Sequence, residues 1–125
     1  MTKVSLIAVL LILSTPALAA DKPDLSTPEK AARAFFDALK SGDAEAVKRT
    51  VAPERVTRLA AQFDDWRKIW AAYKLASIDG AEEVKASGPN PQSAVRVNLL
   101  RPNGSTMKGQ IRFSKIADEW RMDEN

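Results

Sequence analysis

The hydrophobic residues of this chain change their spacing about halfway along it. Between residues 31 and 73 the apolar side chains recur at steps of three and four, which is the period of an amphipathic helix. Between residues 94 and 122 they alternate with polar ones, as in a half-buried strand. Helices followed by strands are typical of α+β domains, where the helices cover one face of an antiparallel sheet. The sequence therefore predicts three N-terminal helices packed on a curved antiparallel sheet of three to four strands.

A single glycine separates the first two predicted helices. Ser26 or Thr27 can cap a helix whose first turn contains Pro28. Gly42 is placed to end that helix in the left-handed conformation, and Asp43 is placed to cap the next one. We therefore expect a tight helix–helix junction at this glycine.

The remaining elements are a long helix and a strand meander. Residues 54–72 are predicted as one helix about 28 Å long, enough to cross the domain, and it carries most of the aromatic side chains. Residues 75–86 are ambiguous, because Gly80 indicates a bulge or bend. Strands are predicted over residues 94–101, 106–114 and 119–123.

The first residues have the pattern of an export signal. An apolar run over residues 4–13 is followed by a small-x-small pattern at 17–19. The run has about ten residues, whereas a membrane-spanning helix needs roughly twenty. We therefore expect a cleaved signal peptide over residues 1–20, a mobile lead-in over 21–26 and one domain over 27–125. The mature protein is expected to be periplasmic or secreted, with no membrane span.

The composition narrows the chemistry available to this domain. The 125 residues include no cysteine and no histidine. Histidine is the commonest metal ligand and the commonest general base near neutral pH, so we expect neither a metal nor a cofactor. The net charge of +3 is a small excess of basic residues, and nucleic acid is not expected as a partner.

The segment TPEKAARAFFDALKSGDAEAV resembles the opening of nuclear transport factor 2-like domains, and the ending SKIADEWRMD resembles their last strands. The likeness is to small bacterial exported domains of unknown function. It rests on Pro28, Glu29, Phe35 or Phe36, Ala38, Leu39, Gly42, Asp43, Lys115 and Trp120. The resemblance implies a cystatin-like α+β cone. It does not imply one activity, because the superfamily includes isomerases, dehydratases, secretion-system assembly domains and members with no known activity. Many of these relatives are lipoproteins, whereas this chain lacks the lipidated cysteine.

The resemblance also implies where catalytic groups would lie, namely on the inner sheet face or on the long helix. The inner face predicted from alternation holds no titratable group. It consists of Val95, Val97, Leu99, Met107, Gly109, Ile111, Phe113, Trp120 and Met122. Asp79 points inward if Leu75 does, and outward if Ala76 and Ile78 do. With Tyr73 as a donor, an inward Asp79 would suit an isomerase or lyase, but an exposed aspartate before a glycine turn is the favoured interpretation.

Two surfaces are candidates for binding. The aromatic residues on the predicted helices and on the last strand could line a cone mouth that holds a small apolar or aromatic ligand, although such residues also commonly fill a small core. They are Phe36, Trp66, Trp70, Tyr73 and Trp120. The outer sheet face carries Arg96, Asn98, Lys108, Gln110, Arg112 and Arg121. Such a face is either solvated or a docking surface, for an acidic envelope protein or for a second copy in a homodimer.

The sequence thus predicts an exported, non-catalytic binding or interaction domain. Two alternatives remain open, an enzyme of isomerase or lyase type using Asp79 and Tyr73, and a protein-docking domain of a cell-envelope assembly.

Overall fold

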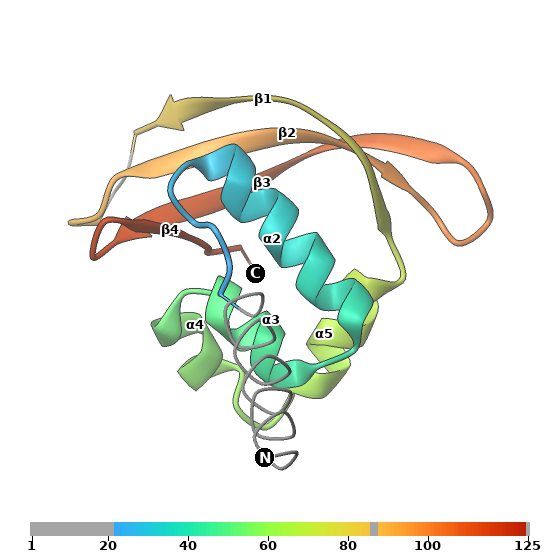
Figure 1. The fold of residues 1–125 in the computed structure, drawn as a ribbon, viewed down its shortest axis with the longest axis horizontal. Coiled ribbons are helices and arrows are strands. Elements are labelled where there is room, and N and C mark those ends of the chain that lie inside the picture. Colours follow the sequence, from blue (N-terminus) through green and yellow to red (C-terminus); the bar gives the residue numbers. More distant parts are fainter. Residues whose placement is uncertain (1–21, 86–87, 125) are drawn as a thin grey trace, which may run out of the picture.

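The computed structural model describes residues 22–85 and 88–124. In this part of the chain, helices come first and an antiparallel sheet follows, so the predicted α+β class is confirmed (Figure 1). The predicted signal peptide over residues 1–20 lies outside the described residues.

The described helices lie beneath an arched sheet (Figure 1). They are α2 (Pro28–Ser41), α3 (Ala44–Thr50), α4 (Pro53–Arg58) and α5 (Phe63–Ala71). The strands are β1 (Lys74–Val84), β2 (Gln92–Leu100), β3 (Thr106–Ile116) and β4 (Glu119–Met122), and they pair in that order. Within the described ranges, none of the helices has the length and apolar character needed to cross a bilayer.

The junction between α2 and α3 follows the local sequence chemistry. Thr27 caps α2 by accepting a hydrogen bond from the Lys30 amide at 3.1 Å. Gly42 ends the helix with φ of 77°, a left-handed conformation that costs glycine little. The Asp43 carboxylate then accepts from the Glu45 amide at 3.0 Å and caps α3. The predicted tight junction at Gly42 is confirmed.

The third predicted helix is broken, which corrects the expectation of one continuous helix over residues 54–72. The chain forms α4 and α5 instead, and residues 59–62 between them contain neither glycine nor proline. Neither residue type explains the break, which coincides with tertiary contacts on both sides of it and with one local hydrogen bond. α4 is tied to the end of the sheet, where Arg55 pairs with Asp123 at 3.2 Å, whereas α5 packs against α2 and α3. The Thr57 hydroxyl also donates to the carbonyl four residues earlier, a bond that bends helices.

β1 does not keep a strict alternation of inward and outward side chains. Register shifts lie between Leu75 and Ser77 and between Ile78 and Gly80. As a result Leu75, Ile78 and Ala81 all pack against the core, although they are three residues apart. The sequence leaves open whether Leu75 or Ile78 points inward. In the structure both point inward, because the β-bulges change the direction of the side chains along the strand.

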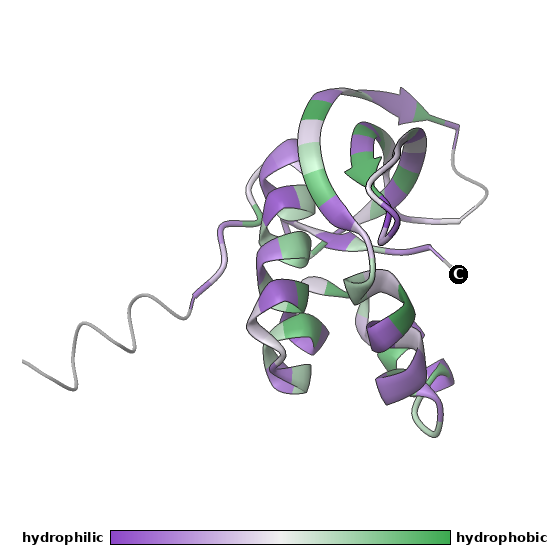
Figure 2. Ribbon diagram, turned by 90° about the vertical axis from the view of Figure 1, so that its right-hand side faces the viewer, coloured by the Kyte–Doolittle hydropathy of each residue, from purple (hydrophilic) through white to green (hydrophobic). Residues whose placement is uncertain are grey.

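The core lies between α2 and the concave face of the sheet. α2 contacts all four strands, and Figure 2 shows the sheet curling over the helices with hydrophobic and hydrophilic residues alternating along it. Cross-strand pairs on the inner face include Val95 with Ile111 and Phe113 with Met122. These residues, together with Phe35 of α2, are fully or almost fully buried.

Two segments outside the strands are fastened to β4. The Trp120 amide donates to the Leu25 carbonyl at 2.9 Å, and the Leu25 side chain is buried in the core. The lead-in that the sequence predicts to be mobile is therefore anchored at this residue. On the outer edge of β4, Val51 forms a parallel bridge with Met122, and the Ala52 amide donates to the Met122 carbonyl at 2.9 Å.

Candidate functional site

An aromatic cluster fills the space where α2 meets α5. Phe35 lies at its centre, with ring centroids 5.3 Å from Phe36, 6.2 Å from Trp66 and 5.6 Å from Trp70. Phe63 extends the cluster and stacks 5.5 Å from Trp66. Most of these pairs have the edge-to-face or tilted geometry that aromatic rings prefer, so the cluster stabilises the helical layer beyond its buried area.

The structure brings together three of the five predicted binding residues. Trp70 lies 6.3 Å from both Phe36 and Trp66. Tyr73 and Trp120 make no ring contact with another aromatic residue of the described part, although both pack half-buried against the core. Trp120 lies on β4, and Tyr73 lies in the turn between α5 and β1. The predicted set is therefore divided among a helical cluster, a turn and a strand.

Trp66 has one unsatisfied polar atom. Its indole Nε1 is buried and has no hydrogen-bond partner. A buried donor without a partner costs about 1–3 kcal/mol. Trp66 lines neither of the pockets described below, so this buried atom does not place a ligand beside the cluster.

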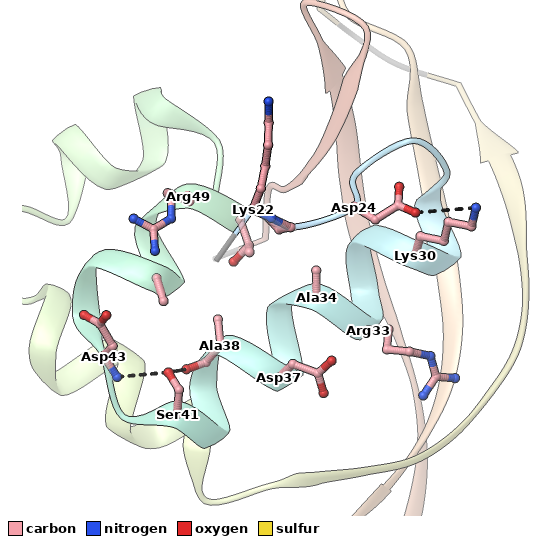
Figure 3. A pocket seen from close by; sticks show the side chains of 13 residues that line it. Lys22, Asp24, Lys30, Arg33, Ala34, Asp37, Ala38, Ser41, Asp43 and Arg49 are labelled. Atoms are coloured by element: carbon pink, nitrogen blue, oxygen red, sulfur yellow. Dashed lines mark hydrogen bonds and ion pairs between the residues drawn. The ribbon is translucent and has the colours of Figure 1, made fainter. Parts of the chain in front are cut away.

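One pocket is a groove along the solvent side of α2 and α3 (Figure 3). Figure 3 shows Ala34 and Ala38 pointing from α2 into this groove. Its volume is about 510 Å³, and charges of both signs surround it. One of its lysines, Lys30, is already paired with Asp24 at 3.5 Å. The groove lining carries four cations and three carboxylates, so its charges nearly balance, and it shares Arg33 and Asp37 with the pocket described next.

The second pocket, which we call the side pocket, lies between α2, the end of α5 and the start of β1. It also has a volume of about 510 Å³. Phe36 and Leu39 form a buried apolar floor, and Tyr73 and Leu75 are half-buried opposite them on the chain entering β1. The full lining is Arg33, Phe36, Asp37, Leu39, Lys40, Ala71, Tyr73, Lys74 and Leu75. Neither pocket is lined by a residue of β2, β3 or β4.

Asp79 and Tyr73 do not share a pocket. Asp79 is exposed, and both of its carboxylate oxygens accept from the Asn98 side-chain amide at 3.0 Å. Asn98 lies between the buried residues Val97 and Leu99 on β2, so its side chain is on the outer face. The structure therefore gives Asp79 the exposed position that the sequence favours, whereas Tyr73 lines the side pocket.

The outer sheet face is less basic than its own strands suggest. Carboxylates from β1 lie beside it, and Arg96 pairs with Glu82 at 3.4 Å. Arg121 is turned toward α3, where its Nε donates to the Arg49 carbonyl at 3.2 Å. Lys108, Gln110 and Arg112 remain exposed on β3. The predicted docking or dimer surface is thus reduced to this one strand, and its partner stays a prediction.

Sequence reasoning missed the charged part of the side pocket. Arg33 and Lys40 lie on the exposed side of α2, Lys74 is the first residue of β1, and none of the three is among the predicted site residues. The signal that could have found them is the spacing of residues 33, 36, 37 and 40, which places two cations on the side of the helix that also carries Phe36. No local sequence pattern predicts that Lys74 and Leu75 of β1 line the pocket, because their position depends on where α5 ends.

The comparisons with known proteins support the fold. No family model matches the chain, and no curated protein matches it. Among solved structures, it is similar to a protein of Campylobacter jejuni described as a "putative NTF2-like transpeptidase". The two structures superpose with a TM-score of 0.54 at 19% sequence identity, covering 80% of this chain and 100% of the other. At this identity the likeness concerns the fold alone, and the chain has the NTF2-like fold that its sequence resembles.

Proposed function

We propose that this protein is a non-catalytic binding domain for a small ligand with an apolar or aromatic body, and that the ligand lies in the side pocket. The observation that carries the proposal is the convergence of Phe36 and Tyr73, from two segments distant in sequence, on one pocket of about 510 Å³. Pockets of roughly 300–1,000 Å³ with an apolar floor and a few polar groups are typical of small-molecule sites.

The absence of a catalytic constellation around this pocket supports binding rather than turnover. The titratable groups that line it are Arg33, Asp37, Lys40, Tyr73 and Lys74. Asp37 has no basic side chain of the described residues within 4.0 Å. Asp79, the acid of the isomerase or lyase alternative, is engaged by Asn98 on the outer face instead.

The solved neighbour's name refers to a transpeptidase, and we do not extend that activity to this chain. Acyl transfer most often draws on cysteine or serine as nucleophile with histidine as base. This chain contains neither cysteine nor histidine.

Binding of N-phenyl-1-naphthylamine tests the proposal. This uncharged aromatic probe becomes fluorescent in an apolar site, and we expect saturable binding to the full protein. Tyr73→Ser removes the ring from the pocket wall and should weaken binding by about tenfold or more, because a buried aromatic contact contributes about 1.5–3 kcal/mol. Ile69→Ser is the matched control, because Ile69 is 66% exposed and lines neither pocket.

Circular dichroism and urea unfolding of each variant establish that it is folded before binding is compared. The proposal is wrong if the probe does not bind the wild-type protein. It is also wrong if Tyr73→Ser and Ile69→Ser, both folded, bind the probe as the wild type does.

A further inference from the structure

The rim of the side pocket carries three cations and one carboxylate. Arg33 and Lys40 come from α2, and Lys74 comes from the opposite wall at the start of β1. Asp37 is the only acidic residue of the lining. All four side chains are exposed, whereas the floor beneath them is apolar. The pocket thus places positively charged side chains around a small, buried apolar floor.

These three cations are not neutralised within the described part of the chain. No carboxylate of residues 22–85 or 88–124 lies within 4.0 Å of the charged groups of Arg33, Lys40 or Lys74. Some other cations of the fold are paired, including Lys30 with Asp24 and Arg96 with Glu82, whereas Lys108 on the outer sheet face also has no carboxylate of the described residues within 4.0 Å. The side pocket differs from such single surface cations because three unpaired cations line one pocket with an apolar floor.

The cations approach the pocket from two sides. Arg33 and Lys40 are seven residues apart on α2, which places them two turns and about 10 Å apart along one side of the helix. Lys74 stands on the other wall, next to Tyr73. A ligand body lying on Phe36 and Leu39 would therefore be flanked by three cations. Arg33 and Lys40 would lie on its α2 side, and Lys74 would lie on the β1 side of the pocket. Opposite charge on the ligand would lower the repulsion among these cations.

We infer that the ligand of the side pocket is an organic anion, with a carboxylate, sulfonate or phosphate at the rim and an apolar or aromatic body on the floor. This inference rests on the proposed function and specifies the chemical class of its ligand. Arg33, Lys40 and Lys74 recognise the anionic group, and Phe36, Leu39 and Tyr73 contact the body.

Two probes with the same carbon skeleton test the charge preference. 8-Anilinonaphthalene-1-sulfonate differs from N-phenyl-1-naphthylamine by one sulfonate group. We expect the full protein to bind the sulfonate more tightly. Raising the salt from about 20 mM to about 300 mM should weaken binding of the sulfonate but not of the neutral probe, because salt screens exposed charges.

Charge variants locate the effect in the side pocket. Lys40→Gln and Lys74→Gln should each weaken sulfonate binding about two- to fivefold, as expected for exposed charge pairs. Neither should change binding of the neutral probe. Lys108→Gln is the matched control, because it removes the same charge from an exposed lysine on the outer sheet face.

A soluble anion and an anionic lipid share this chemistry. Displacement of the bound sulfonate by sodium decanoate indicates a free ligand, and displacement only by phosphatidylglycerol vesicles indicates a membrane-borne one. Either result supports recognition of an anion, and displacement by neither contradicts it.

The two proposals fail in different ways. Equal affinity for both probes, or equal effects of Lys40→Gln, Lys74→Gln and Lys108→Gln, would overturn the anion preference and leave the binding domain intact. Failure to bind either probe would overturn both.

Discussion

Asp24 accepts two hydrogen bonds from one neighbour at the start of the described chain. The Ser26 hydroxyl donates to Oδ1 at 2.7 Å, and the Ser26 amide donates to the same oxygen at 3.1 Å. Lys30 lies 3.5 Å from the other oxygen. These partners favour the ionised carboxylate, the hydroxyl most strongly, and lower the pKa of Asp24 below its ordinary value of 3.8.

The sign of this shift determines its pH dependence. Because the folded-state pKa is the lower one, the interaction stabilises the fold above the unfolded pKa and is lost as the pH falls through the folded pKa. Ser26→Ala should raise the pKa of Asp24 toward 3.8, and Lys30→Gln should raise it less. Carboxyl carbon NMR titration measures both. A larger effect of Lys30→Gln would show that charge, rather than hydrogen bonding, controls this aspartate.

At the scale of elements, two glycines differ in backbone conformation, because Gly42 has a positive φ and Gly109 does not. Gly42 ends α2 in the left-handed region, and a β-carbon there would touch nothing within 4 Å, so only backbone strain opposes a side chain. Gly109 pairs with Val97 on the inner sheet face, and a β-carbon there also meets open space, without a positive φ. Because neither site is crowded, comparing the two isolates the effect of backbone strain at Gly42.

Gly42→Ala should lower the free energy of unfolding by about 1 kcal/mol, the cost of placing alanine in the left-handed region. Gly109→Ala should be neutral or raise it by about 0.5–1 kcal/mol, because alanine loses less chain entropy than glycine on folding. Urea unfolding followed by tryptophan fluorescence provides both values. Equal changes in the two variants would contradict the backbone argument.

Local chemistry explains which elements could be predicted from the sequence. Gly42 and Asp43 act through their own conformations and hydrogen bonds, so the α2–α3 junction was predictable. The break at residues 59–62 was not, because Arg55 is held by Asp123, a residue 68 positions later. The side pocket also depends on contacts between segments that are distant in the sequence. Phe36 and Tyr73 were candidates as aromatic residues, but only the folded chain places Lys74 across from α2.

β1 shows why simple alternation fails where a strand bends. Gly80 has φ of 141°, and a β-carbon there would lie 2.8 Å from the Arg96 guanidinium. The residue can therefore only be glycine if Arg96 keeps its position across the sheet. A pattern with period two cannot describe a strand that is re-aimed at such a point, and this is why the orientation of Asp79 stayed open in the sequence.

At the scale of the whole molecule, α2 joins the helical layer to the sheet, and its residue Phe35 lies at the centre of the aromatic cluster. Phe35 is fully buried and touches rings of both α2 and α5, while α2 itself contacts every strand. Domains of this size are stabilised by only about 5–15 kcal/mol. A cavity at Phe35 would therefore remove a large part of the free energy of unfolding.

Phe35→Ala should lower the free energy of unfolding by about 3–5 kcal/mol. Ile69→Ala removes a large apolar side chain that is 66% exposed and should change it by less than about 0.5 kcal/mol. Thermal and urea unfolding compare the two. Similar losses in both variants would mean that the cluster does not organise the core.

The closure of β4 by Val51 and Ala52 limits how this protein can polymerise. Within the described chain, Val51 and Ala52 occupy the outer edge of β4, β1 is open along its outer edge, and residues 106–111 of β3 extend beyond β4 with no strand beside them. Open-ended fibres grow when every added subunit presents a new free strand. Two copies joined through β1 would still expose residues 106–111 of β3, so any further strand would have to add there and not at β4.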